Sequence, residues 1–149
     1  MESKKLSDRV RFFSLFKRFV SAAETAIRYR ATPLTALVFQ SAAAYPGLVF
    51  LSRCEQELRA GVDFPTAWAT GVECGKKGQG LKPEDAELLL GFGQGLGISD
   101  VEGQVAHCAL YANLAEERYG QAKEEKTKKG KLYFMLGVLS GVAAALFCI

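Results

Sequence analysis

The chain has 149 residues, of which 49% are hydrophobic and 23% charged, and its net charge is +3. These values fit one globular domain with a core, and they exclude a disordered tract, a multi-domain enzyme and a strongly basic nucleic-acid-binding protein. Residues 1–30 contain eight basic residues (Lys or Arg) and three acidic ones (Asp or Glu). Residues 31–122 contain six basic and eleven acidic residues, and residues 123–131 contain five basic and two acidic residues. Basic ends therefore flank an acidic middle.

The first predicted helix follows Ser7 or Asp8, because either side chain can cap a first helical turn. Apolar residues then recur at helical spacing, with a basic face opposite them, at Phe12, Phe16, Phe19, Ala23, Ala26 and Ile27. We expect the Phe-bearing face to pack into the core of the domain. Burial of the same face in a lipid interface is the alternative.

Three shorter helices are predicted next. Pro33 favours a helix start, and Thr32 is its expected cap. A third helix is expected to end at Gly61, and Asp63 to cap a fourth, which carries Trp68 into the core.

Two glycine-rich stretches are similar in composition to nucleotide-binding loops, but their residue spacing does not match such loops. The sequence GKKGQG at 75–80 lacks the Lys-Ser or Lys-Thr pair and the preceding strand of a phosphate-binding loop, so we interpret it as a plain loop. The sequence LLLGFGQGLG at 88–97 lacks the third glycine of a dinucleotide fingerprint. We predict instead that Pro83 opens a fifth helix, that its glycines allow neighbouring helices to approach closely, and that Gly97 ends it.

Ser99 and Glu102 form a capping-box pattern that opens the longest predicted helix. Apolar and small residues alternate along it by four and three residues, at Val101, Val105, Cys108, Ala112, Ala115, Tyr119 and Ala122. We expect this seam to pack inside the bundle. Self-association into a homo-oligomer along the seam is the alternative.

Residues 132–149 contain no charged side chain and are predicted to form a transmembrane helix. Such a helix would span ~27 Å, close to the roughly 30 Å of a bilayer core. Residues 123–131 form a predicted basic juxtamembrane linker that holds a helical domain, residues 1–122, on the cytoplasmic side; its lysines include Lys126, Lys128, Lys129 and Lys131. Small residues for packing against a second transmembrane helix are Gly137, Gly141 and Ala145.

The sequence contains no catalytic or metal-binding pattern. His107 is its single histidine, and its four cysteines lack metal-ligand spacing. We therefore expect reduced thiols, no catalytic residue, no metal and no cofactor. A small helical enzyme is the weaker alternative.

A set of short motifs is spread over most of the chain. Tyr29, Thr32 and Pro33 lie near the end of the first helix; Gly93, Gly97 and Asp100 lie within FGQGLGISDVEGQ at 92–104, and the apolar C-terminal run follows. In this combination the chain resembles the stage III sporulation protein AB family of endospore-forming bacteria. That family is similar to the cytoplasmic F domain of type II secretion and type IV pilus platform proteins.

The resemblance implies an all-α cytoplasmic bundle of about six helices with a C-terminal transmembrane helix in the mother-cell membrane. It implies a non-enzymatic scaffold in the channel complex between mother cell and forespore, needed for stage III of sporulation. The implied partners are the membrane and other subunits of the complex, its cytoplasmic ATPase among them, and no nucleic acid. The alternative is a platform fragment or adaptor of another type II secretion or type IV pilus-like system.

Overall fold

The computed structural model of the chain describes residues 2–147, and the side chains of residues 4–141. Over this range the chain forms helices and no strand, in the order α1 (Glu2–Arg30), α2 (Leu34–Ala44), α3 (Val49–Arg59), α4 (Phe64–Gly75), the 3₁₀ helix η1 (Lys76–Gly78), α5 (Pro83–Gly95) and α6 (Val101–Phe147). The predicted all-α bundle is confirmed for this part of the chain.

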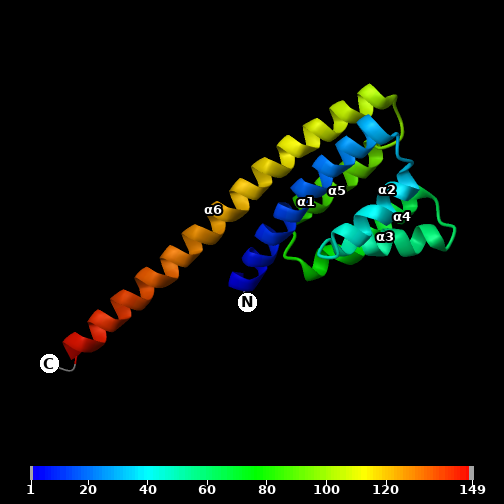
Figure 1. Cartoon of the computed structure of the whole chain (residues 1–149). Helices are drawn as coiled ribbons and strands as arrows, with labels where there is room; N and C mark the ends of the chain where they lie inside the picture. Colours follow the sequence, from blue (N-terminus) through cyan, green and yellow to red (C-terminus); the bar gives the residue numbers. More distant parts are fainter. Residues whose placement is uncertain (1, 148–149) are drawn as a thin grey trace.

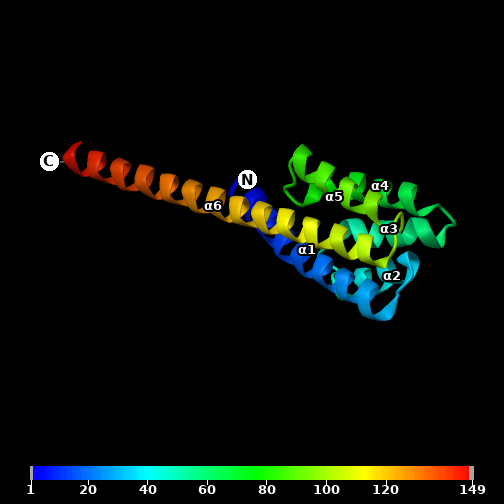
Figure 2. The same ribbon diagram turned by 90° about the horizontal axis from the view of Figure 1, so that it is seen from above.

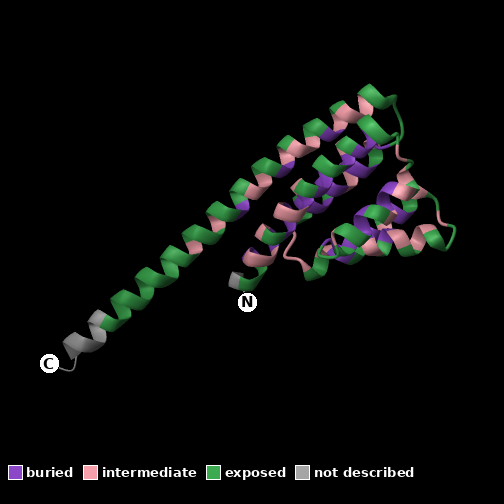
Figure 3. Ribbon diagram, viewed as in Figure 1, coloured by how far each residue is buried: buried purple, intermediate pink, exposed green. Residues whose placement is uncertain are grey.

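Two long helices, α1 and α6, lie side by side and run in opposite directions (Figures 1 and 2). The shorter helices complete the bundle: α2 contacts α1, α3 contacts α2 and α4, and α5 contacts α4 and α6. The C-terminal half of α6 projects well beyond the bundle, and its described side chains are mostly exposed (Figure 3). With 47 residues, α6 is ~70 Å long and passes without interruption through the expected linker at 123–131.

The core of the bundle is aromatic. Phe12 and Phe16 of α1 are fully buried and pack against Phe50 of α3, with ring centroids 6.0 and 6.3 Å apart. Phe92 of α5 meets Phe16 edge-on at 5.8 Å. The indole Nε1 of buried Trp68 donates a hydrogen bond to the carbonyl of Leu89 at 2.8 Å. The prediction that the Phe-bearing face of α1 forms the core is therefore confirmed.

The seam of α6 packs against α1. Cys108, Ala115 and Ala122 of this seam are fully buried, because α6 places them against the facing side of α1. Small side chains at these positions let the two helix backbones approach closely. The prediction of internal packing is confirmed, whereas self-association stays a prediction.

Three glycines of α5 provide the predicted close approach between helices. A Cβ atom at Gly91 would clash with Tyr111, one at Gly93 with the ring of Trp68, and one at Gly95 with the ring of His107. The predicted helix end at Gly97 is also confirmed, since α5 stops at Gly95 and Gly97 has a φ of +80° in the turn that follows.

One predicted helix cap is confirmed and three are wrong. Neither Ser7 nor Asp8 caps the first helix, because α1 already begins at Glu2 and both residues lie inside it. The Asp63 carboxylate accepts a hydrogen bond from the Thr66 N–H at 3.1 Å. The Thr32 hydroxyl instead donates to the carbonyl of Ala26, at 3.3 Å, because the last carbonyls of α1 lack helical partners. At the start of α6, Asp100 takes the role expected of Ser99, and its Oδ1 accepts from the Gly103 N–H at 2.8 Å.

The predicted transmembrane helix over 132–149 requires a correction. Within the described residues, none of the helices combines the length and apolar character needed to cross a membrane. The lysines of 123–131 directly precede the apolar run in the same unbroken helix. Side chains 142–149 lie outside the described residues.

Candidate functional site

Most of the motif residues meet at one tip of the bundle, opposite the end at which the chain begins (Figure 1). The bundle tip is defined here by two turns, residues 29–34 from the end of α1 to the start of α2 and residues 96–100 between α5 and α6. The turns touch, because a Cβ atom on Gly97 would lie 2.7 Å from Cδ1 of Leu34. Tyr29, Thr32, Pro33, Gly97 and Asp100 are therefore neighbours in space although they come from distant parts of the sequence.

Local backbone chemistry shapes both turns. After α1 ends at Arg30, Ala31 has a φ of 49°, which is uncommon for a residue with a side chain and turns the chain sharply. Pro33 then precedes the first turn of α2. In the second turn, Gly97 supplies the positive φ, and Asp100 caps α6. These residues fix the shape of the tip.

Two large side chains at the tip extend into solvent. Tyr29 is 73% exposed and Ile98 is 79% exposed, and among the other described large hydrophobic residues only Phe134, at 73%, is as exposed as Tyr29. The guanidinium of Arg28 lies 5.8 Å from the Tyr29 ring centroid. Exposed aromatic and apolar groups with a neighbouring arginine are typical of the anchors of protein interfaces.

A groove of about 560 Å³ lies next to these side chains, between the end of α1 and the start of α6. Its charged residues are Glu24, Arg28 and Glu102, and its apolar floor comes from α6, at Val101, Val105, Ala106 and Ala109. Glu24 and Arg28 form an ion pair at 3.8 Å, with both groups partly exposed. An apolar floor with a charged rim suits a side chain or short segment of a protein partner.

The remaining predicted site residues lie away from the tip. Gly93 is buried against Trp68 and has a packing role. On α6, Lys129 is half-buried and lines a pocket at the opposite end of the bundle, and the other predicted basic residues, Lys126, Lys128 and Lys131, are exposed. Gly137 and Gly141 are exposed, with open space at their Cβ positions; Ala145 lies outside the described side chains. Packing of these small residues against another helix stays a prediction.

Sequence reasoning missed a buried ion cluster around Asp85. The Asp85 carboxylate is fully buried and accepts hydrogen bonds from Arg9 Nε at 2.7 Å and Nη2 at 3.0 Å, from Arg118 Nη1 at 2.7 Å and from the Lys82 backbone N–H at 2.9 Å. Glu125 extends the cluster, pairing with Arg9 at 3.5 Å and with Lys82 Nζ at 3.1 Å. The cluster ties α1, α5 and α6 together.

The charge state of the cluster follows from its hydrogen bonds. Burial raises the pKa of Asp85, but the hydrogen bonds from Arg9, the Lys82 N–H and Arg118 outweigh it and hold this pKa below its usual value. The hydrogen bond to Asp85 is also the main cause that raises the pKa of Arg9. Both groups are therefore charged in the folded chain at neutral pH.

The described residues do not place a catalytic or metal-binding group at the tip. No group of three or more His, Cys, Asp and Glu among them could hold a metal ion. The His107 ring stacks on Phe92 at 5.5 Å, and its Nε2 lies 2.8 Å from the Phe92 carbonyl. Burial raises the thiol pKa of Cys54 to about 12 and of Cys108 to about 11, so neither is a reactive thiolate.

The comparisons with known proteins decide the family. The profile of the family described as stage III sporulation protein AB matches residues 1–149. The chain belongs to this family. A curated member, stage III sporulation protein AB of Bacillus subtilis (strain 168), is 29% identical over 139 residues, which are 91% of this chain and 81% of the relative.

A solved structure of stage III sporulation protein AB is also similar. Its TM-score is 0.72 and its identity 27%, and the match covers 81% of this chain and 98% of the solved chain. The resemblance stated from the sequence is confirmed, and with it a role in sporulation.

Proposed function

We propose that this chain is a non-enzymatic scaffold of the channel complex between mother cell and forespore, and that its bundle tip docks another subunit of that complex. The first candidate for the docked subunit is the cytoplasmic ATPase of the complex. The observation that carries the proposal is the gathering of exposed motif residues, Tyr29, Pro33 and Asp100, at one tip of the bundle. A groove lined by their sequence neighbours Arg28 and Val101 lies beside them. Their exposure favours a role in recognition, since side chains that only support the fold are usually buried.

The shape of the molecule supports the same proposal. The tip lies at one end of the molecule, and the described part of α6 extends away from it past the other end (Figure 1). Exposed lysines are followed directly by exposed apolar side chains on this projection, with Lys131 next to Leu132 and Phe134. Such a surface favours contact with the anionic face of the mother-cell membrane. The tip would then point away from the lipid and toward a partner in solution.

The test replaces the exposed tip residues one at a time. Tyr29→Ser and Ile98→Ser should each leave thermal unfolding nearly unchanged, because both side chains lie mostly in solvent. Each should lower the number of heat-resistant spores in an endospore-forming host that depends on this chain. Each should also reduce recovery of channel subunits with the full-length chain from sporulating cells.

The matched control is Val49→Ser, which removes an exposed apolar side chain at the start of α3, outside the tip. This variant should sporulate normally and retain its partners. Normal spore counts and unchanged recovery of partners for both tip variants would contradict docking at the tip.

A further inference from the structure

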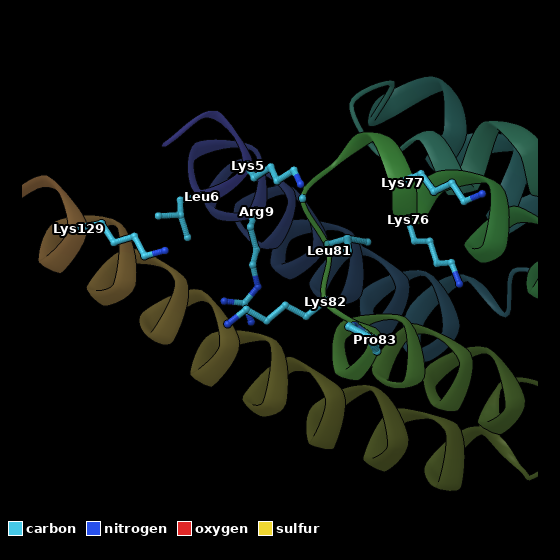
Figure 4. Close-up of a pocket in the computed structure, with 10 residues that line it drawn as sticks. Lys5, Leu6, Arg9, Lys76, Lys77, Leu81, Lys82, Pro83 and Lys129 are labelled. Carbon is cyan, nitrogen blue, oxygen red and sulfur yellow. The ribbon is translucent and has the colours of Figure 1, made fainter. Parts of the chain in front are cut away.

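A basic pocket of about 480 Å³ lies at the end of the bundle opposite the tip (Figure 4). It opens between the first turns of α1, the connection from η1 to α5, and α6. Six of its ten lining residues are cations and none is a carboxylate; the cations are Lys5, Arg9, Lys76, Lys77, Lys82 and Lys129. We propose that this pocket binds a phosphorylated ligand carrying two or more ionised phosphate groups. This inference is independent of docking at the tip.

The positive charge of the pocket is only partly offset by ion pairs. Arg9 is buried and fully engaged by Asp85 and Glu125, at 2.7 and 3.5 Å, so its charge is offset. Lys76 pairs with Glu73 at 2.9 Å, and Lys82 pairs with Glu125 at 3.1 Å. Lys5 and Lys77, from α1 and η1, form no ion pair with any described residue. Two ammonium groups from different elements are thus available to a ligand, and Lys76 and Lys82 can add to them because their carboxylate partners are partly exposed.

The wall of the pocket is held in place by a close backbone contact. Gly80 has a φ of +68°, and a Cβ atom at this position would clash with the carbonyl oxygen of Lys5. Only glycine combines this backbone conformation with so close an approach, so the segment before α5 lies tightly against α1. The pocket is therefore formed by the fold itself, and its lysines do not come from one mobile loop.

The chemistry of the lining favours phosphate over other anions. Lysine ammonium groups act as strong point charges for phosphate oxygens. Leu6, Leu81 and Pro83 supply an apolar part of the wall that an organic portion of the ligand can contact. The volume falls within the range of about 300–1,000 Å³ typical of small-molecule sites. A compact polyanion fits such a pocket better than an extended nucleic acid strand does.

The same phosphate chemistry can come from a free small molecule or from a lipid headgroup. The first arm of the test titrates the full chain with inorganic tripolyphosphate by isothermal titration calorimetry at physiological ionic strength. The second arm measures co-sedimentation with phosphatidylcholine vesicles prepared with and without cardiolipin. Each arm compares the wild type with Lys5→Ala/Lys77→Ala and with a control, Arg11→Ala/Arg18→Ala, which removes two exposed cations of α1 outside the pocket lining.

We expect saturable binding in at least one arm. In that arm Lys5→Ala/Lys77→Ala should raise the dissociation constant about tenfold or more, because two charge-assisted hydrogen bonds are lost. The control should bind within about twofold of the wild type, since it leaves the pocket intact. Binding of tripolyphosphate identifies a free ligand, and binding only to cardiolipin vesicles identifies a headgroup.

Two results would overturn the inference. One is the absence of saturable binding in both arms. The other is an equal loss of binding in the pocket variant and the control, which indicates general attraction to a basic surface. The tip variants Tyr29→Ser and Ile98→Ser should bind the probes normally, so failure of this inference is distinguishable from failure of docking at the tip.

Discussion

Replacing Asp85 by Asn tests whether the buried ion cluster holds the bundle together. The substitution keeps the size of the side chain but removes the negative charge that Arg9 and Arg118 share, and it turns an amide N–H₂ toward one of these donors. Leaving a buried charge without its partner costs about 3–5 kcal/mol. Arg118 is partly exposed and can turn to water, so we expect the lower part of this range, about 3 kcal/mol.

Unfolding of the full chain, followed by circular dichroism in heat and in urea, measures this cost. At about 2–4 °C per kcal/mol for a chain of this size, the melting temperature should fall by about 6–12 °C. The control is Asp63→Asn, which makes the same chemical change at an exposed helix cap, where Asn serves almost as well as Asp. The reasoning is refuted if the unfolding free energy of Asp85→Asn lies within about 1 kcal/mol of that of the wild type, because the expected loss is about 3 kcal/mol.

The pH dependence of unfolding gives a second measure of the same carboxylate. The pKa of Asp85 is lower in the folded chain than its usual value of about 3.9. Its contribution to stability is therefore fully present above that value and is lost as the pH falls through the folded pKa. We expect the difference in unfolding free energy between wild type and Asp85→Asn to be constant near neutral pH and to narrow below about pH 4. A constant difference down to strongly acidic pH would contradict the assigned shift.

Two further predictions concern packing and thiol chemistry. Gly93→Ala should destabilise the bundle by about 1–3 kcal/mol and change the near-UV circular dichroism of Trp68, because the added Cβ meets the indole ring; an unchanged spectrum would argue against this contact. Iodoacetamide at pH 8 should modify exposed Cys74 before Cys54 and Cys108, which should react only on unfolding, since burial raises their pKa to about 12 and about 11. Peptide mapping that finds Cys54 modified as fast as Cys74 would contradict the burial.

The sequence predicted well those features that depend on local spacing. The Phe residues of α1 recur every three or four positions, and this periodicity identified the core side of the helix. The glycines of α5 were correctly interpreted as points of close approach, because glycine inside a helix has a cost that packing must offset. The confirmed cap at Asp63 rests on the same kind of local signal.

Features that depend on distant residues were missed. Arg9 and Asp85 are 76 positions apart, and periodicity gives no information about which charges pair across the fold. One local signal was available: Arg9 precedes Phe12 and Phe13 by three and four residues, and therefore lies on the buried side of α1. A charge on an apolar helix side predicts a buried partner. The grouping of lysines into one pocket likewise required the packing of α1 against the segment before α5.

The predicted transmembrane helix failed for a related reason. Its basis was the absence of charge over 132–149, which is a property of composition. None of the described helices meets the joint requirement of length and hydropathy for a membrane span, and α6 continues without a break from the charged residues 123–131 into this run. Hydropathy alone gives no boundary inside an unbroken helix.

The position of the Asp85 cluster explains why a buried ion network is kept where apolar packing would serve stability equally well. Ala122 is the last buried residue of the described part of α6, and Glu125, which pairs with Arg9, follows it within one helical turn. The directional hydrogen bonds of the Asp85 cluster fix the angle at which α6 projects from the bundle. Apolar contacts would specify this angle less tightly. Arg9→Met combined with Asp85→Leu should therefore recover most of the stability that Asp85→Asn loses, while amide hydrogen exchange in residues 118–131 stays faster than in the wild type. Exchange in that segment at the wild-type rate would show that packing alone orients α6.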